Sequence, residues 1–194
     1  MDIICCAFPA WEGDYVKSTV ELMRATAGQG HRVLYVDYAW TWTDFLKNFL
    51  GKNTRSWQRM LGLKPRISQK MDSLFVLTLP PVLPTNFLKN ARLHDAVNRF
   101  NAIFLAKTIR KAAKKLQMDA PTVINAFNPR FGVPLAGQLG ECALLYYCYD
   151  EIGAAAWAGR HGERLEKAFL KKCDAAIATS DGLFEKLKKG HDRV

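Results

Sequence analysis

Short, uninterrupted apolar runs alternate with helical patterns along nearly the whole chain, and this alternation limits the fold more than any other feature. The runs lie at 3–8, 32–38, 74–79, 122–127, 143–149 and 175–179. Strands that are apolar at nearly every position, rather than at every second one, are typical of a parallel sheet covered on both faces. We therefore predict an α/β fold: a doubly wound, mostly parallel, Rossmann-like sheet of about six strands with helices on both faces.

Two helical patterns connect these runs most clearly. After the first run, apolar residues recur at spacings of 4, 3 and 4, which predicts a helix that buries Val16, Val20, Met23 and Ala27. The longest pattern covers 88–117 and has two apolar stripes, rotated by one residue. The first stripe is Leu93, Val97, Phe100 and Phe104, and the second is Leu105, Ile109, Ala112 and Leu116.

The alternation of strands and helices is interrupted at 39–72, where we predict an insertion with one or two short helices. Five large aromatic residues are interleaved there with seven basic ones, and Asp44 is the only acidic residue before Asp72. Such a segment fits a membrane surface, with rings at headgroup depth and cations against anionic lipid. The residues expected to make this contact are Trp40, Trp42, Lys47, Lys52, Arg55, Trp57 and Arg59. In the alternative, the aromatic rings pack onto the sheet edge and leave only solvated lysines.

Charge and cysteine content restrict the partners and the compartment. The formal net charge of +10 favours anionic partners, although the basic clusters are also compatible with solvated helix faces. Five cysteines without a C-x-x-C spacing indicate free thiols in a reducing cytoplasm, and no metal site. The longest apolar run, 143–149, is far below the roughly 20 residues of a membrane span. We expect no signal peptide, and a cytoplasmic protein that contacts the inner face of the membrane peripherally at most.

Polar residues follow four of the predicted strands, where sheets of this kind bind ligands. For the strand order 3-2-1-4-5-6, the crevice lies beyond the carboxyl ends of strands one and four. The candidates are Trp11, Glu12 and Gly13, then Asn125, Asn128 and Arg130, then Asp150 and Glu151, and finally Ser180. Sugar hydroxyls need paired donors and acceptors, which these residues supply. We therefore predict a sugar-binding cleft.

Several candidates also have a purely structural interpretation. Asn128 precedes a proline and can build a turn, while Asp150 and Ser180 can cap helices. Trp11 can be a core aromatic. The motifs of dinucleotide, ATP, zinc and α/β-hydrolase sites are absent, and the four histidines have no metal-ligand spacing.

Three segments resemble family 4 glycosyltransferases. "GQGHRVLYVD" is similar to the L-x-x-x-G-H-x-V-x-V-x opening of that family. "ALLYYCYDE" and "GERLEKAFLKKCDAAIATSDGLFEKL" resemble the end of its first domain, where a helix with a leading glutamate precedes a-D-x-i-x-x-S-x-x-L. The matching residues here are Glu166, Asp174, Ala175, Ser180 and Leu183.

The resemblance implies a two-domain GT-B enzyme whose first domain binds a carbohydrate or lipid-linked acceptor. The second domain binds the nucleotide-sugar and carries an E-x7-E motif, and no two glutamates of this chain are eight positions apart. Residues 1–194 would then be the amino-terminal, acceptor-side domain, with no cofactor of its own and no activity alone. The nucleotide-sugar donor would belong to the second domain, which is absent here.

The resemblance also implies roles for single residues. After the strand that corresponds to 143–149, the family often has a histidine, whereas this chain has Asp150 and Glu151 at that place. This resembles the "Y-D-x-x-D" variant of family members that build envelope polysaccharides. The family typically retains anomeric configuration, and the leaving phosphate takes the acceptor proton. Glu12, Asp14 and Asp150 would orient the acceptor or stabilise positive charge, with Glu12 and Asp150 as the catalytic candidates.

A rival interpretation is a non-catalytic Rossmann-like module that binds an anionic ligand or nucleic acid. The charge and the mixture of aromatic and basic residues favour it. No nucleic-acid-binding motif is present, so we expect no nucleic-acid partner. A small methyltransferase is a weaker rival, because the loop after the first strand lacks the glycine-rich turn such enzymes need.

Overall fold

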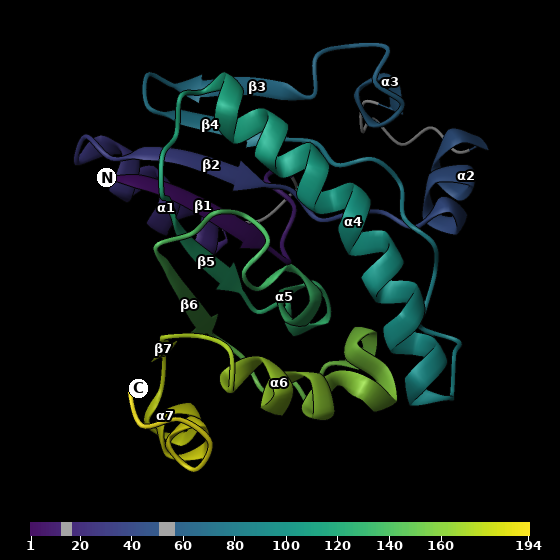
Figure 1. Cartoon of the computed structure of the whole chain (residues 1–194), viewed down its shortest axis with the longest axis vertical. Coiled ribbons are helices and arrows are strands. Elements are labelled where there is room, and N and C mark those ends of the chain that lie inside the picture. Colours follow the sequence, from purple (N-terminus) through teal and green to yellow (C-terminus); the bar gives the residue numbers. More distant parts are fainter. Residues whose placement is uncertain (13–16, 51–56) are drawn as a thin grey trace.

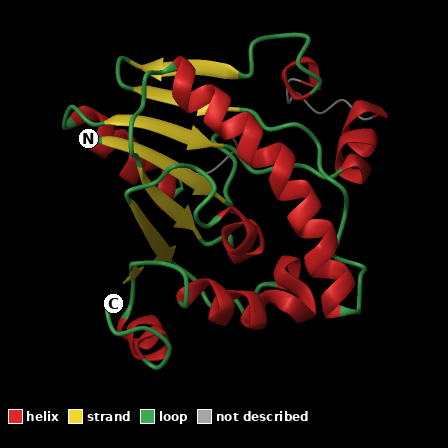
Figure 2. Ribbon diagram, in the orientation of Figure 1, coloured by secondary structure: helices red, strands yellow, loops and turns green. Residues whose placement is uncertain are grey.

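The computed structural model describes residues 1–12, 17–50 and 57–194, which form one seven-stranded sheet with helices on both faces (Figures 1 and 2). The strands are β1 (Asp2–Ala7), β2 (Arg32–Val36), β3 (Ile67–Met71), β4 (Leu74–Leu77), β5 (Thr122–Ala126), β6 (Ala143–Cys148) and β7 (Ala175–Ala178). The helices are α1 (Ser18–Gly28), α2 (Trp42–Leu50), α3 (Trp57–Met60), α4 (Ala91–Lys115), α5 (Pro129–Leu135), the 3-10 helix η1 (Ala156–His161), α6 (Gly162–Leu170) and α7 (Asp181–Lys188).

The strand order confirms the doubly wound prediction. It is β3-β4-β2-β1-β5-β6-β7, and the six predicted strands pair in parallel in the order 3-2-1-4-5-6. The prediction of about six strands missed β3, which pairs antiparallel with β4 at the sheet edge. Its sequence, ISQKM, is mostly polar because both of its faces are at least partly exposed. In its described part, the predicted insertion therefore contributes two short helices, as expected, and also a strand.

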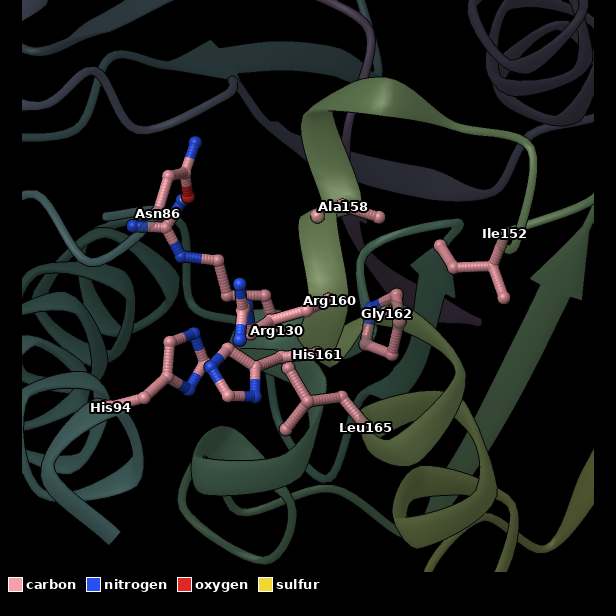
Figure 3. Close-up of a pocket in the computed structure, with 11 residues that line it drawn as sticks. Asn86, His94, Arg130, Ile152, Ala158, Arg160, His161, Gly162 and Leu165 are labelled. Carbon is pink, nitrogen blue, oxygen red and sulfur yellow. The ribbon is translucent and has the colours of Figure 1, made fainter. Parts of the chain in front are cut away.

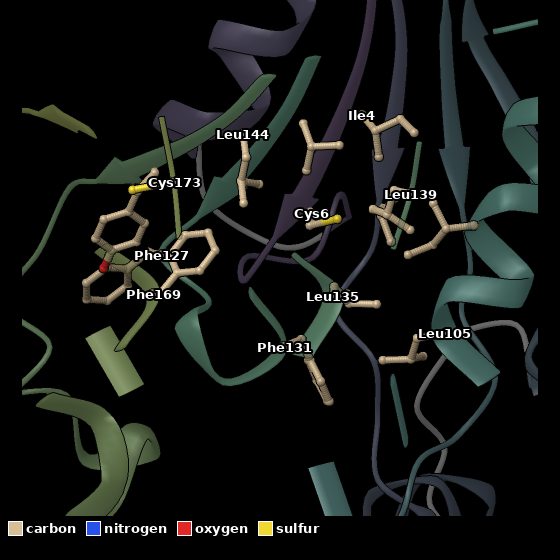
Figure 4. Close-up of a cluster of buried hydrophobic side chains, with 14 of the residues drawn as sticks. Ile4, Cys6, Leu105, Phe127, Phe131, Leu135, Leu139, Leu144, Phe169 and Cys173 are labelled. Atoms are coloured by element: carbon tan, nitrogen blue, oxygen red, sulfur yellow. The ribbon is translucent and has the colours of Figure 1, made fainter. Parts of the chain in front are cut away.

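Both faces of the sheet are buried, which explains the uninterrupted apolar strands. In β1, Ile4 and Cys6 point into the larger core beneath α4, α5 and α6, whereas Ile3 and Cys5 point into the core beneath α1. Figure 4 shows the larger core, where Leu105 of α4 and Phe169 of α6 are fully buried. In α1, the predicted face is confirmed for Val20, Met23 and Ala27, while Val16 lies outside the described residues.

The first half of α4 faces the opposite way from the prediction. Of the expected stripe, Leu93, Phe100 and Phe104 are about half exposed and Val97 is partly buried. The helix buries His94, Asn98 and Asn101 instead. The cause is the connection at 78–90, which lies against this side of the helix. Asn101 Nδ2 donates to the Leu83 carbonyl at 2.9 Å, and Asn101 Oδ1 accepts from the Leu83 amide at 2.9 Å. Polar side chains are needed there to form hydrogen bonds with the backbone groups of this connection.

Two smaller predictions can also be compared with the structure. The helix expected at 134–139 begins earlier, at Pro129, a residue whose fixed φ suits a first helical position. All five cysteines are free as predicted, and only Cys142 is exposed. Burial raises the pKa of the Cys6 thiol to about 12, so this thiol stays protonated and unreactive at neutral pH.

In the described part of the chain, no helix combines the length and the apolar character that crossing a membrane would require. Among the same residues, no cluster of histidine, cysteine and carboxylate side chains could hold a metal ion.

Candidate functional site at the carboxyl edge of the sheet

The helices change face between β1 and β5, which makes this the switch point of the sheet. α1 follows β1 and packs on the smaller core, whereas α5 follows β5 and packs on the larger one. At such a point the two connections diverge and leave space beyond the strand ends. Two cavities flank it, and we name them the Glu12 cavity and the Arg130 cavity.

The Glu12 cavity lies beyond the carboxyl ends of β1, β2 and β4 and has a volume of about 250 Å³. Its lining is mainly polar and consists of Trp11, Glu12, Asp37, Arg59, Met60, Lys64, Ser68, Lys70, Val76 and Thr78. Lys70 of β3 forms a salt bridge with Glu12 at 3.1 Å. Asp37 Oδ1 accepts hydrogen bonds from the backbone amides of Trp11 and Tyr38, at 3.0 and 3.1 Å. The cavity thus offers carboxylates, hydroxyls and cations together.

The Arg130 cavity lies beyond β5, between α4 and η1, and at about 10 Å³ it has room for about one water molecule (Figure 3). Arg130 is 7% exposed; its Nη1 donates to Asn86 Oδ1 at 2.9 Å. Its Nη2 is buried and has no hydrogen-bond partner among the described residues. A buried donor of this kind calls for an acceptor oxygen, from a water or a ligand.

Two buried histidines form the floor of the Arg130 cavity. The rings of His94 and His161 are stacked, with centroids 4.1 Å apart. His161 Nε2 lies 2.8 Å from the Leu88 carbonyl oxygen, and His94 Nδ1 lies 3.2 Å from Asp95 Oδ1. Asp95 also accepts two hydrogen bonds from Arg164, at 2.8 and 2.9 Å. These contacts join α4 to the end of η1 through His161 and to α6 through Arg164.

Burial lowers the pKa of His94, and the nearby His161 and Arg130 act in the same direction, while Asp95 opposes them. Below the usual histidine pKa the unfolded chain therefore binds more protons than the folded chain, and stability falls as pH falls. We expect the melting temperature of the wild-type protein to fall between pH 7 and pH 5. The melting temperature of His94→Gln should fall less over the same range. Circular dichroism melts at the two pH values measure this. An equal drop in both proteins would contradict it.

The first predicted site residues lie at the Glu12 cavity. The Trp11 ring is buried in the smaller core and contacts the Tyr35 ring edge-on, with centroids 5.1 Å apart. Trp11 is therefore a core aromatic, as its structural interpretation predicted, and the residue also borders the cavity. Glu12 is exposed at the cavity. Gly13 and Asp14 lie outside the described residues.

The two predicted asparagines build the turn after β5. Asn125 Nδ2 donates to the Asn128 carbonyl at 3.0 Å, and Asn125 Oδ1 accepts from the Asn128 amide at 2.9 Å. Both residues are buried, and Phe127 between them has a φ of +55°, which is uncommon outside glycine. This turn places Arg130 in its cavity.

The remaining predicted residues line neither cavity. Asp150 is exposed and accepts a hydrogen bond from the Glu151 amide at 2.8 Å, while Glu151 forms an ion pair with Lys186. Ser180 caps α7 by accepting from the Leu183 amide at 3.4 Å. Glu12 and Asp150 therefore do not share either cavity.

Sequence reasoning missed several residues that the fold brings to these cavities. Asp37 directly follows β2, so the rule that located Glu12 could also have found it. Ser68 and Lys70 belong to the unpredicted strand β3. His94 and His161 meet from 67 positions apart, and no pattern in the sequence links them.

Comparison with known proteins supports the fold. No protein-family model and no curated protein matches the sequence. Two solved structures of sucrose-phosphate synthase from Thermosynechococcus elongatus are similar, with TM-scores of 0.56 and 0.62 and identities of 14% and 13%. The first match covers 100% of this chain and 84% of that one, and the second covers 98% of this chain and 45% of that one.

MurG of Acinetobacter baumannii also matches, with a TM-score of 0.41 and 13% identity over 92% of this chain and 41% of that one. Its score is too low to argue from. The two synthase matches cover essentially the whole chain, and their low identities limit the likeness to the fold. The chain therefore shares the Rossmann-like α/β fold of these two sucrose-phosphate synthase structures.

Proposed function

We propose that this chain binds the sugar acceptor of a glycosyltransferase, and that the acceptor occupies the Glu12 cavity. The observation that carries the proposal is a polar cavity of about 250 Å³ beyond three parallel strands of this fold. A sugar hydroxyl both donates and accepts hydrogen bonds, so its site needs groups of both kinds. Asp37, Thr78 and Lys70 provide them in the lining of one cavity.

Within this cavity, Asp37 is the group best prepared to receive a hydroxyl. Two backbone amides hold one of its oxygens, so the carboxylate is fixed before a ligand arrives. Lys70 already neutralises Glu12, whereas Arg59 and Lys64 bring further positive charge to the wall. This excess of cations suits an acceptor that carries an anionic group, such as a phosphate.

The finer parts of the proposal rest on the resemblance of 28–37, 143–151 and 162–187 to family 4 enzymes. In this scheme a second domain holds the nucleotide-sugar, and this chain alone transfers no sugar. The chain spans 45% of the longer sucrose-phosphate synthase chain, which leaves room for such a domain in a related enzyme. The scheme also includes transfer with retention of configuration, an electrostatic role for Glu12, and a place in cell-envelope polysaccharide or glycolipid synthesis. Asp150 has no part in it, because this residue lines neither cavity.

Nuclear magnetic resonance titration of the chain with hexoses, N-acetylhexosamines and hexose phosphates tests the acceptor site. We expect the amide signals of Asp37, Tyr38 and Thr78 to shift, and the phosphates to bind more tightly. Asp37→Asn should weaken binding about tenfold, because a hydrogen bond to a charged group is worth about 1.5–3 kcal/mol. Asp119→Asn, an exposed carboxylate outside the cavity, is the matched control. Shifts confined to other regions, or equal affinity of Asp37→Asn, would refute the site.

A further inference from the structure

The outward face of α4 is apolar in its first half, which is unusual for a helix on the surface. Phe100, Ile103 and Phe104 are 50%, 64% and 51% exposed, and Leu93 lies on the same face one helical repeat earlier. The rings of Phe100 and Phe104 contact each other edge-on, with centroids 5.0 Å apart. The buried polar residues of this half, Asn98 and Asn101, point inward to the 78–90 connection, so the helix leaves these large apolar residues in water.

Other elements extend this apolar face. Phe100 and Phe104 line a hollow of about 270 Å³ together with Trp42 of α2 and Leu83, both of which are about 40% exposed. We call Trp42, Leu83, Phe100, Ile103 and Phe104 the α4 patch. Large contiguous apolar surfaces of this kind mark sites of contact with a partner or a membrane.

The charges around the patch indicate the nature of the partner. α4 carries seven basic residues and one acidic residue, and that acid, Asp95, is paired with Arg164. Helical spacing places Lys107 and Lys111 on the same outward face as Phe100 and Phe104, one and two turns further on. The partner must therefore be both apolar and anionic. A second copy of the chain fits poorly, because it would bring two rows of cations together.

We propose that the α4 patch and the lysines beyond it dock the protein on an anionic lipid bilayer. The aromatic rings enter the boundary between headgroups and acyl chains, and Lys107 and Lys111 lie against anionic headgroups. An α-helix with an apolar stripe and basic flanks has the properties of an interfacial helix. The inference concerns where the protein resides, so it does not depend on the proposed acceptor site.

This surface differs from the membrane contact predicted from the sequence. Trp42 belongs to the patch and Lys47 is exposed on α2, but Trp40 is half-buried. Trp57 lies on α3 with Arg59, which lines the Glu12 cavity. Lys52 and Arg55 lie outside the described residues. The proposed contact therefore centres on α4 instead of 39–72.

Co-sedimentation with vesicles tests the proposal. We expect binding to phosphatidylcholine vesicles that contain phosphatidylglycerol, little binding to pure phosphatidylcholine, and weaker binding in high salt. Phe100→Ser with Phe104→Ser should reduce binding at least tenfold. Lys107→Gln with Lys111→Gln should reduce it about 25-fold, at about fivefold per cation.

Matched controls lie on other surfaces. Leu22→Ser removes an exposed apolar residue of α1, on the other face of the sheet, and Lys171→Gln with Lys172→Gln removes two exposed cations after α6. Both should bind within twofold of wild type, and thermal melts verify that all variants fold. Vesicle binding that the patch variants leave unchanged would overturn the proposal. So would concentration-dependent self-association without lipid that Phe100→Ser with Phe104→Ser abolishes.

Discussion

Replacing Lys186 with methionine is expected to lower the free energy of unfolding by about 3 kcal/mol. Lys186 Nζ on α7 lies 2.7 Å from Glu166 Oε2 on α6, and Glu166 is only 2% exposed. Without the ammonium group, the buried carboxylate keeps the Tyr146 hydroxyl at 2.7 Å and loses its counter-charge. An uncompensated buried charge costs about 3–5 kcal/mol, and the partly exposed position of Lys186 favours the lower end.

Urea unfolding of the full chain measures this effect. Lys189→Met, at an exposed lysine of the same segment, is the control and should change stability by less than about 0.5 kcal/mol. Adding Glu166→Gln to Lys186→Met should recover part of the loss, because the charge that lost its partner is then removed. If Lys186→Met is as stable as the control, the ion pair does not hold α6 and α7 together.

The residues that carry the resemblance to family 4 enzymes thereby acquire a physical explanation. Glu166 joins β6, α6 and α7 through Tyr146 and Lys186. Asp174 Oδ2 accepts from the Leu144 amide at 2.7 Å, Ser180 caps α7, and Leu183 is buried. These residues determine how the last strands and helices assemble. A match in them is therefore informative about the fold and much less so about the substrate.

The topology was predictable because strands that are buried on both faces are apolar at nearly every position, which can be seen directly in the sequence. Each of the six parallel strands is a nearly continuous apolar run, and parallel strands with helical connections allow few arrangements. β3 left no such trace, since an edge strand with exposed residues can be polar. The sequence also did not reveal which face of α4 is buried. Asn98 and Asn101 are buried because they bond to Thr85 and Leu83, and nothing in the helix itself reveals those partners.

The site was predictable only in part, for a related reason. The rule that ligands bind beyond the carboxyl ends of strands identified Glu12 and Arg130, which line the two cavities. It could not separate side chains that face a cavity from those that build turns, as Asn125 does, or cap helices, as Ser180 does. The other walls come from β3, α3 and η1, whose positions depend on tertiary packing.

Gly132→Ala tests how closely α5 must approach the sheet beside the Arg130 cavity. A Cβ at this position would lie 2.7 Å from Asn125 Nδ2, closer than real Cβ contacts come, and 3.0 Å from the Phe169 ring, which is tighter than most real contacts. Asn125 cannot easily move, because it holds the turn at Asn128, and Phe169 is fully buried. We expect a loss of about 2 kcal/mol, within the 1–3 kcal/mol typical of overpacked cores.

A matched substitution separates this contact from the general effect of glycine in a helix. Gly182 lies in α7 with open space around the position of its Cβ, so Gly182→Ala should be neutral or stabilise by up to about 1 kcal/mol. Urea unfolding compares the two variants. Adding Phe169→Leu to Gly132→Ala should cost less than the sum of the two single changes, because both act on one contact. Strict additivity, or equal stability of Gly132→Ala and Gly182→Ala, would mean that α5 does not depend on this close approach.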